Sequence, residues 1–486
     1  MDDRPNDVDR AAHGTCEWLL RHNTYKDWTS ENRGLLWIVG KPGSGKSTLL
    51  KHALGHQSEH NVEHNVGHNV GHNVGTIILV FFFHGRGGEF QRTPLGLFRS
   101  LLHQLLNHAP NASPDLVAKF QERKNTIGEP DEKWQWHPNE LQTFFTSSLR
   151  RVSESRPVCL FVDALDECGE DDARGLAQYF EALLQELPST GSQSRICFTC
   201  RHFPILALDQ AFKICVEEEN KEDISTYVQT QLSEVCEKAP YIPATITNHA
   251  SGVFMWAHLM TKRVRDRKLA GDSFKKINKE IQSIPSTLES LYDDLIQRMD
   301  NKPASLKLIQ LICFASEPLS LDELRWAMVV DGDGLYQSLR ECRDSPDFAC
   351  NCENACNCDT MEKRVTTLSC GLAETTSSSH GPTVQFIHQS VADFFVEKEG
   401  LLALDGCKTS TEAASRAHFQ ITKICIHYLK MEEIGLSTSY SKNDFPFIRY
   451  AADSWFFHAQ CTDGSVPQED LLNLLTWPSN SFIESW

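Results

Sequence analysis

Residues 40–47 read Gly40-Lys41-Pro42-Gly43-Ser44-Gly45-Lys46-Ser47, and this stretch decides the fold of the chain. It matches the pattern G-x-x-x-x-G-K-[ST], in which glycines let the backbone wrap around a phosphate without Cβ clashes. The apolar run at 35–39 predicts a buried strand before it, and the residues from Thr48 onward predict a helix after it. A strand, a glycine-rich loop and a helix in this order predict a P-loop that binds a nucleoside triphosphate.

The residues of this loop have separate expected tasks. Its backbone N–H groups would line an anion-binding nest at the positive end of the following helix. Lys46 would reach the β- and γ-phosphates, and the hydroxyl of Ser47 would hold Mg²⁺. The expected cofactor-binding residues are Gly40, Lys41, Pro42, Gly43, Ser44, Gly45, Lys46, Ser47 and Thr48.

Apolar strand-like runs and amphipathic segments alternate from residue 35 to residue 216. Further strands are expected at 77–83, 158–163 and 195–201, and helices at 94–106, 139–152 and 172–187. This alternation predicts an α/β P-loop NTPase core with a parallel, doubly wound sheet.

The strand signal fades after residue 217, where helices are expected at 223–235, 243–264, 287–299, 411–430 and 444–459. Two short strands, at 365–368 and 384–387, follow a run of short helices, which predicts a winged helix. The predicted division is a helical lead-in (1–34), the NTPase core (35–216), a helical domain (217–300), a winged-helix domain (301–405) and a C-terminal helical segment (406–486).

Composition narrows the class of protein. A chain of 486 residues is too long for one hydrophobic core. Its net charge of -18 argues against a nucleic-acid groove or an anionic membrane surface as the main partner. The first seven residues do not resemble a secretory or mitochondrial presequence, and no apolar run is long enough to span a bilayer. Together with seventeen cysteines, these features predict a cytoplasmic protein with reduced thiols.

Acidic residues follow the strand at 158–163, in the order Asp163-Ala164-Leu165-Asp166-Glu167. A P-loop enzyme needs a carboxylate at the end of a neighbouring strand to hold its Mg²⁺, and Asp163 fits this task. Glu167 is expected to orient the attacking water, and Asp166 to share either task. The expected metal-binding pair is therefore Ser47 and Asp163, acting on Mg²⁺ that arrives with the nucleotide.

A cation follows the next strand, in the order Thr199-Cys200-Arg201. Arg201 is expected to sense or neutralise the γ-phosphate, where charge develops during transfer, with Thr199 in support. The expected catalytic residues are Lys46, Asp163, Asp166, Glu167 and Arg201.

Two inserts have more than one interpretation. In the His-Asn-Val repeat at 56–75, histidine recurs every fourth residue and would chelate metal on a helix. Because Gly, Asn and Val are poor helix formers, a disordered surface loop is the expected state. A second insert, at 342–360, carries four closely spaced thiols that either bind a soft metal or form a redox-sensitive loop. These thiols are Cys350, Cys352, Cys356 and Cys358.

The order of these motifs resembles the NACHT group of STAND signalling NTPases, and in particular its nephrocystin-like branch in filamentous fungi. The resemblance extends over about residues 11–460 and includes Gly252-Val253-Phe254-Met255-Trp256-Ala257 and Phe386-Ile387-His388-Gln389-Ser390. It implies that the ligands are ATP and ADP with Mg²⁺. GTP stays open as well, because the sequence contains no recognisable motif that would select the base. The resemblance also implies that His388 contacts the β-phosphate of bound ADP. A core histidine with satisfied hydrogen bonds is the alternative.

The function implied by this resemblance is an ATP-binding signal-transduction switch, in which slow hydrolysis controls domain rearrangement and partner assembly. Whether the chain is an enzyme, a nucleoside triphosphatase, stays open on sequence alone. The alternative is a nucleotide-binding interaction module without turnover, because we expect neither an effector domain before the core nor repeats after it. A fragment, a truncated paralogue and an incomplete gene model all fit that alternative. Expected partners are the nucleotide and proteins, including related chains or a second copy, but no nucleic acid and no membrane.

Overall fold

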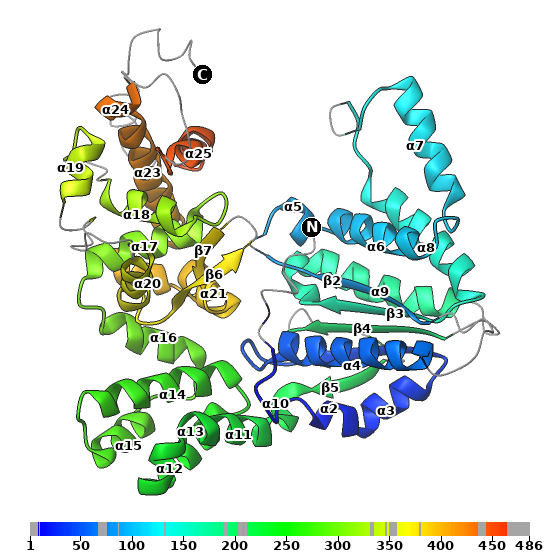
Figure 1. The fold of residues 1–486 in the computed structure, drawn as a ribbon, viewed down its shortest axis with the longest axis horizontal. Helices are drawn as coiled ribbons and strands as arrows, with labels where there is room; N and C mark the ends of the chain where they lie inside the picture. The colour runs from blue at the N-terminus through cyan, green and yellow to red at the C-terminus, as the bar shows by residue number, and fades with distance from the viewer. Residues whose placement is uncertain are drawn as a thin grey trace. The chain divides into compact units, whose positions relative to one another are not determined.

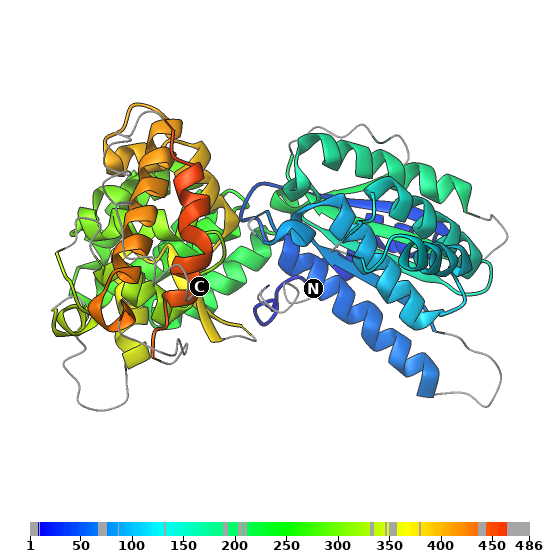
Figure 2. The ribbon, with the colours of Figure 1, turned by 90° about the horizontal axis from the view of Figure 1, so that it is seen from above.

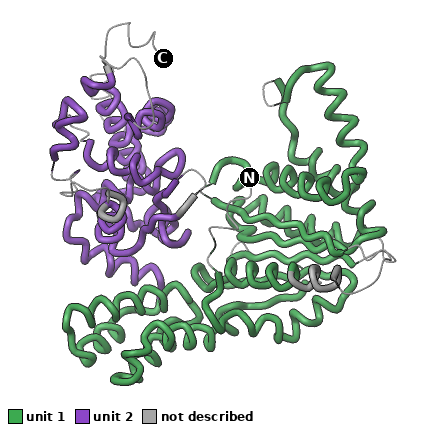
Figure 3. The backbone as a smooth tube through the Cα atoms, in the orientation of Figure 1, with its two compact units in different colours: residues 1–286 green, residues 287–486 purple. Residues whose placement is uncertain are grey.

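The computed structural model describes residues 8, 10–66, 75–85, 87–130, 133–187, 193–202, 208, 211–330, 335–345, 348, 357–378, 381–435 and 444–463. The chain divides into two compact units, residues 1–286 and residues 287–486 (Figure 3). No helix in these described ranges combines the length and the apolar character needed to cross a membrane.

Unit 1 is built on a five-stranded parallel sheet (Figure 1). Its strands are β1 (Arg33–Val39), β2 (Ile77–Phe82), β3 (Val158–Asp163), β4 (Ser194–Cys200) and β5 (Phe212–Cys215), in the order β2-β3-β4-β1-β5. The predicted α/β core is confirmed. The sequence does not predict β5, because four residues are too few for a clear periodicity. Parallel strands place all five carboxyl ends at one edge, where ligands bind in folds of this class.

Helices cover both faces of this sheet (Figure 1, and Figure 2 from above). One face carries α6 (Pro94–His108), α8 (Pro138–Ser153) and α9 (Glu170–Glu186); the other carries α3 (Asn23–Ser30) and α4 (Lys46–Val66). The other helices of this part are α2 (Trp18–Arg21), α5 (Glu89–Arg92), α7 (Pro114–Thr126) and the 3₁₀ turn η1 (Leu165–Cys168).

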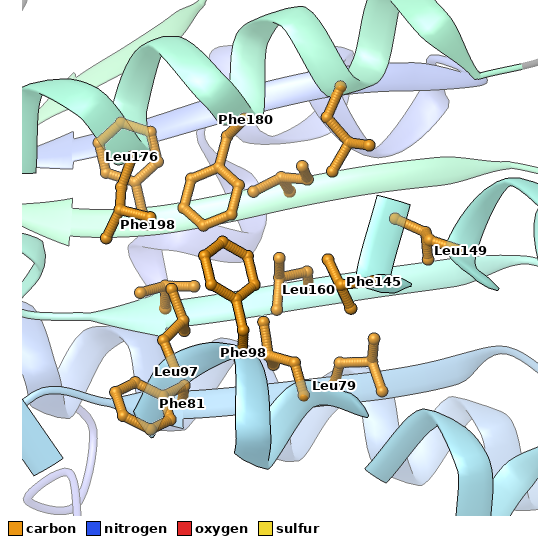
Figure 4. Packing of buried hydrophobic residues seen from close by; sticks show 14 of the residues in the cluster. Leu79, Phe81, Leu97, Phe98, Phe145, Leu149, Leu160, Leu176, Phe180 and Phe198 are labelled. Carbon is orange, nitrogen blue, oxygen red and sulfur yellow. The ribbon is translucent and has the colours of Figure 1, made fainter. Parts of the chain in front are cut away.

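Aromatic side chains fill the core between the sheet and the first helical face (Figure 4). The rings of Phe98 on α6 and Phe145 on α8 lie 5.9 Å apart, and those of Phe180 on α9 and Phe198 on β4 lie 6.5 Å apart. These separations are within the range in which aromatic pairs add to the burial of apolar area. This closely packed layer supports the sheet that carries the strand-end residues.

The remainder of unit 1 is helical. Its helices are α10 (Val216–Glu219), α11 (Lys221–Gln231), α12 (Ser233–Lys238), α13 (Tyr241–Ala250), α14 (Phe254–Leu269) and α15 (Phe274–Ser283). The prediction of one helix over 243–264 is wrong. The backbone leaves the helix at Ser251 and Gly252, whose φ angles of 47° and 81° are left-handed, and a new helix begins at Phe254.

Unit 2 is mostly helical and contains one antiparallel hairpin. Its elements are α16 (Leu288–Gln297), α17 (Lys302–Phe314), α18 (Leu321–Val329), α19 (Leu339–Asp344), α20 (Asn357–Leu368), β6 (Ala373–Ser378), β7 (Gly381–Phe386), α21 (Gln389–Glu397), α22 (Gly400–Asp405), α23 (Ser410–Leu429), α24 (Glu432–Gly435) and α25 (Ile448–Gln460). Helix α16, which the sequence places in the helical domain 217–300, belongs to this unit.

The predicted strand at 365–368 is wrong, because these residues form the last turn of α20. The run of β-branched residues favours a strand locally, but α20 packs against α17 and α18, and Val365 is fully buried there. The first strand of the hairpin is β6, five residues further on. Tertiary packing therefore overrides the local preference at this point.

The two inserts are only partly described. The loop prediction for 56–75 is wrong up to Val66, because α4 continues to that residue. Extending an existing helix costs far less than starting one, so poor helix formers are tolerated at its end. Residues 67–74 lie outside the described residues. So do Cys350, Cys352 and Cys356 and the side chain of Cys358.

Two imidazoles meet between α23 and α25 in unit 2, of which that of His458 is buried and that of His418 is partly exposed. Nδ1 of His418 lies 2.9 Å from Nδ1 of His458, and Nε2 of His458 lies 2.9 Å from the hydroxyl of Tyr450. Burial lowers the pKa of His458 to about 3, and the neighbouring His418 adds to this shift. The folded state therefore holds His458 neutral over a pH range in which the unfolded chain protonates it.

This pair predicts acid sensitivity of the fold. Because the pKa of His458 falls on folding, its contribution to stability is present above the unfolded value of about 6.5 and is lost as pH falls below that value. Between pH 7.5 and 5.5 the wild-type chain should lose about 1.4 kcal/mol more unfolding free energy than His458→Gln. Urea denaturation at the two pH values measures the difference. Equal losses in both proteins would contradict the assignment.

Candidate functional site

The P-loop lies between β1 and α4, at the carboxyl edge of the sheet. Gly43 and Gly45 have φ angles of 72° and 95°, in the left-handed region that suits glycine and strains other residues. The helix begins at Lys46, so the N–H groups of its first turn are directed toward the loop. The backbone of this segment thus has the conformation that a phosphate-binding loop requires, and phosphate binding itself stays a prediction.

Lys46 is folded back over the loop that precedes it. Its Nζ donates hydrogen bonds to the carbonyl oxygens of Gly40 and Lys41, at 2.8 and 2.9 Å. The side chain is only half-buried by surface area, but its ammonium is enclosed, and this burial lowers the pKa of Lys46. The carboxylates of Asp166 and Asp163 oppose the shift. The cation thus lies between the loop and the acidic residues that follow β3.

Asp163 ends β3 and is fully buried. Its Oδ1 accepts a 2.6 Å hydrogen bond from the hydroxyl of Thr199 on β4, and that hydroxyl accepts a 2.8 Å bond from the N–H of Ala164. This chain of bonds fixes the carboxylate at the strand end. The hydroxyl of Thr199 therefore positions Asp163, whereas the sequence led us to expect that Thr199 supports Arg201.

Asp166 and Arg201 form an ion pair. Oδ1 of Asp166 accepts from the backbone N–H of Arg201 at 3.0 Å, and Oδ2 lies 3.0 Å from the guanidinium Nε. Burial raises the pKa of Asp166, while Arg201 and then Lys46 lower it. A carboxylate bound at both oxygens in this way orients the arginine. Asp166 is thus a positioning residue for Arg201, a contact that the sequence does not predict.

Glu167 connects β3 to the loop that follows β2. Its Oε2 accepts a 2.8 Å hydrogen bond from the backbone N–H of Gly85. The five predicted catalytic residues all belong to unit 1 and lie on segments at the carboxyl edge of one sheet. The hydroxyl of Ser47 and the carboxylate of Asp163 are hard oxygen donors on neighbouring segments, a donor set that fits Mg²⁺.

The helical part of unit 1 binds the P-loop directly. Asn220 is buried, and its Nδ2 donates to the carbonyl oxygens of Ser44 and Gly252, each at 2.9 Å. The N–H of Met255 donates to the carbonyl oxygen of Gly43, also at 2.9 Å. A Cβ at Gly252 would collide with the backbone of Glu217, so only glycine permits this close approach.

We call Asn220, Gly252 and Met255 the loop clamp. Sequence reasoning missed Asn220, because a single asparagine in a polar run has no distinctive pattern. The positions of Gly252 and Met255 lie in a stretch that the sequence singled out only by resemblance.

Loss of the loop clamp should destabilise unit 1. In Asn220→Ala, two buried carbonyl groups lose their donor, and each such group costs about 1–3 kcal/mol. We expect the unfolding free energy to fall by about 2–4 kcal/mol in urea denaturation. Asn23→Ala, on the exposed face of α3, should change it by no more than about 0.5 kcal/mol. Similar values for both variants would show that the bonds of Asn220 contribute little.

His388 lies in unit 2 and caps α21. Its Nδ1 accepts a 3.0 Å hydrogen bond from the N–H of Ser390 and lies 2.8 Å from the hydroxyl of that residue. The same hydroxyl lies 2.8 Å from the hydroxyl of Tyr292 on α16. All of these contacts are within unit 2. They do not test the expected contact between His388 and a β-phosphate, which stays a prediction.

Comparisons with known proteins match parts of this chain. Residues 14–201, which include the P-loop and Arg201, match the family described as "Nephrocystin 3, N-terminal". This match confirms the expected resemblance to nephrocystin-like NTPases for these residues.

Two curated relatives match a larger part of the chain. The vegetative incompatibility protein HET-E-1 of Podospora anserina is 24% identical over 420 residues, 82% of this chain and 27% of the relative. The azaphilone pigments biosynthesis cluster protein L of Monascus ruber is 22% identical over 330 residues, 64% of this chain and 62% of the relative. The chain thus spans less than two thirds of the length of either protein.

Among solved structures, the Aeropyrum pernix ORC2 protein in its ADPNP–ADP complexes matches with a TM-score of 0.32 and 12% identity. The match covers 83% of this chain and 97% of that one.

Proposed function

We propose that the chain is a cytoplasmic nucleotide-controlled switch of the NACHT type. The match of residues 14–201 to the nephrocystin 3 N-terminal family supports this proposal. The switch binds ATP or ADP with Mg²⁺ and hydrolyses ATP slowly. The main structural support is that four side chains lie around one P-loop, those of Lys46, Asp163, Asp166 and Arg201. GTP remains a possible ligand, since no described contact selects a base.

Each residue of the site has a task in this proposal. The loop N–H groups and Lys46 bind the β- and γ-phosphates, for which Lys46 exchanges its bonds to the two loop carbonyls. Ser47 and Asp163 hold Mg²⁺, which neutralises phosphate charge. Glu167 orients the attacking water, and Arg201, held by Asp166, stabilises the charge that develops on the γ-phosphate.

The loop clamp is the proposed route from nucleotide to domain arrangement. Because Asn220 and Met255 bind the carbonyls of Ser44 and Gly43, a shift of the loop on phosphate binding would move these two residues and the helices that carry them.

We propose that the helices and hairpin of unit 2 include a winged helix and that His388 completes the off state. Since Nδ1 of His388 accepts a hydrogen bond, its neutral ring carries the proton on Nε2, which suits donation to a phosphate oxygen.

Hydrogen exchange tests the switch. Saturating ADP and a non-hydrolysable ATP analogue should give different exchange in the peptides that contain residues 252–258 and 388–397. Identical exchange in both complexes would exclude a nucleotide-dependent rearrangement of these parts.

Phosphate release then separates a hydrolysing switch from a nucleotide-binding interaction module. Slow release that disappears in the Lys46→Ala protein is expected for the switch. Phosphate release that never exceeds the level of this variant would favour the interaction module.

The expected partners beyond the nucleotide are proteins, including a second copy of the chain. A gel shift at low salt should show no bound DNA.

A further inference from the structure

Three side chains with metal-binding donors meet beside the P-loop. His202 follows β4, Cys215 ends β5, and Glu217 lies in the first turn of α10. One ring nitrogen, the thiol sulfur and one carboxylate oxygen all lie within 4.8 Å of one another. The donors therefore come from three segments that the parallel sheet brings to the same edge.

We infer that His202, Cys215 and Glu217 form a binding site for a divalent transition-metal cation of the zinc class, with a fourth position open to water. Imidazole, thiolate and carboxylate are the three donor types that Zn²⁺ takes in proteins. The thiolate disfavours Mg²⁺ and Ca²⁺, which prefer oxygen ligands, so this site is distinct from the Mg²⁺ site of the nucleotide.

The present spacing needs only a small adjustment to fit such a cation. With bonds of about 2.0–2.3 Å, tetrahedral ligands lie roughly 3.3–3.6 Å apart. Nε2 of His202 is in contact with Oε1 of Glu217, so the ring must move away from that oxygen. It has room to do so, because 48% of the His202 side chain is exposed, whereas that of Glu217 is 10% exposed.

The carboxylate of Glu217 is already oriented by the P-loop. Its Oε2 accepts a 3.2 Å hydrogen bond from the backbone N–H of Lys41, which leaves Oε1 directed toward His202. Outer contacts of this kind fix a ligating carboxylate in metal sites. A bound cation would therefore join the ends of β4 and β5 to the first residues of the phosphate-binding loop, next to Arg201.

Binding of the cation has to release the proton of Cys215. Burial raises the pKa of this thiol to about 11, and the nearby Glu217 carboxylate adds to the shift. A coordinated thiol is deprotonated, so the affinity for the metal should rise with pH. Without a metal, Nε2 of His202 and Oε1 of Glu217 form only a hydrogen bond, which is the competing interpretation.

Cobalt spectroscopy on the full chain tests the inference. Co²⁺ replaces Zn²⁺ in such sites and gives a near-ultraviolet thiolate-to-cobalt band, which histidine-only sites lack. Because the four closely spaced thiols of the 342–360 insert could also bind Co²⁺, the background protein carries Cys350→Ser, Cys352→Ser, Cys356→Ser and Cys358→Ser. We expect this background to show the band and to saturate it near one Co²⁺ per chain.

Three variants in this background decide the outcome. Cys215→Ser should abolish the band, and His202→Gln, at an exposed position, should weaken Co²⁺ affinity at least tenfold. Cys461→Ser, which removes an exposed thiol after α25, should leave the spectrum unchanged. Circular dichroism confirms that the variants fold. A background without the band, a band that survives Cys215→Ser, or unchanged affinity in His202→Gln would overturn the inference and leave only the hydrogen bond between His202 and Glu217.

Discussion

Lys46→Ala should weaken the binding of MgATP and MgADP at least about 100-fold, close to the loss of measurable binding. Lys46 is the ammonium that the loop encloses, and its two bonds to loop carbonyls leave it poised for phosphate oxygens. A hydrogen bond that involves a charged group contributes about 1.5–3 kcal/mol, and 1.4 kcal/mol corresponds to a factor of ten in affinity. Two lost contacts to the β- and γ-phosphates account for a change of this size.

Isothermal titration calorimetry of both proteins measures this loss. Lys26→Ala serves as the comparison, because Lys26 is an exposed lysine on α3 of the same unit. Its affinity for both nucleotides should equal that of the wild-type chain. If Lys46→Ala bound MgATP as tightly as the wild-type chain, the P-loop would not be the nucleotide site.

Glu167→Gln should bind MgATP normally but hydrolyse it about 100-fold more slowly. Removal of a group that positions or deprotonates the attacking water costs about 10²–10⁴ in rate. Glutamine has the same shape and still accepts the hydrogen bond from the N–H of Gly85, so the loop after β2 keeps its place. The substitution therefore removes the negative charge and keeps this hydrogen bond.

Single-turnover hydrolysis with saturating enzyme separates the chemical step from binding. Glu170→Gln, at the exposed start of α9, is the matched change outside the site and should turn over at the wild-type rate. Wild-type turnover in Glu167→Gln would remove Glu167 from the mechanism. Asp163 or a group on another chain would then have to orient the water.

The α/β core was predictable because its strands are short, continuous apolar runs that end in the functional residues. Gly40–Ser47, Asp163 and Arg201 each follow such a run, and parallel strands bring their carboxyl ends to one edge. Motif spacing alone therefore places these residues together. Their pairing was not predictable, because hydrogen bonds such as that from Thr199 to Asp163 depend on strand order.

The parts that sequence reasoning missed depend on packing between distant segments. Val365 lies in a β-branched run, yet its burial against neighbouring helices keeps it in α20. Asn220 contacts Ser44, 176 residues earlier, and no local pattern announces that contact. Gly252 lies in the break between two helices, where the backbone comes close to Glu217. The helical pattern of the sequence continues through this break and therefore conceals it.

The loop clamp and the proposed metal site act on the same loop from different residues. Asn220 and Met255 bind the carbonyls of Ser44 and Gly43, whereas Glu217 binds the N–H of Lys41. Both sets of contacts come from the helical part that follows β5. Residues 217–255 are thus the region through which events outside the nucleotide site would reach the P-loop.

A nucleotide-controlled switch must first hold a nucleotide in its P-loop. The purified protein, denatured and analysed by mass spectrometry for released nucleotide, shows this occupancy directly. We expect close to one ADP or ATP per wild-type chain and none from Lys46→Ala. A wild-type chain that releases no nucleotide and also fails to bind added MgADP would contradict the proposed switch.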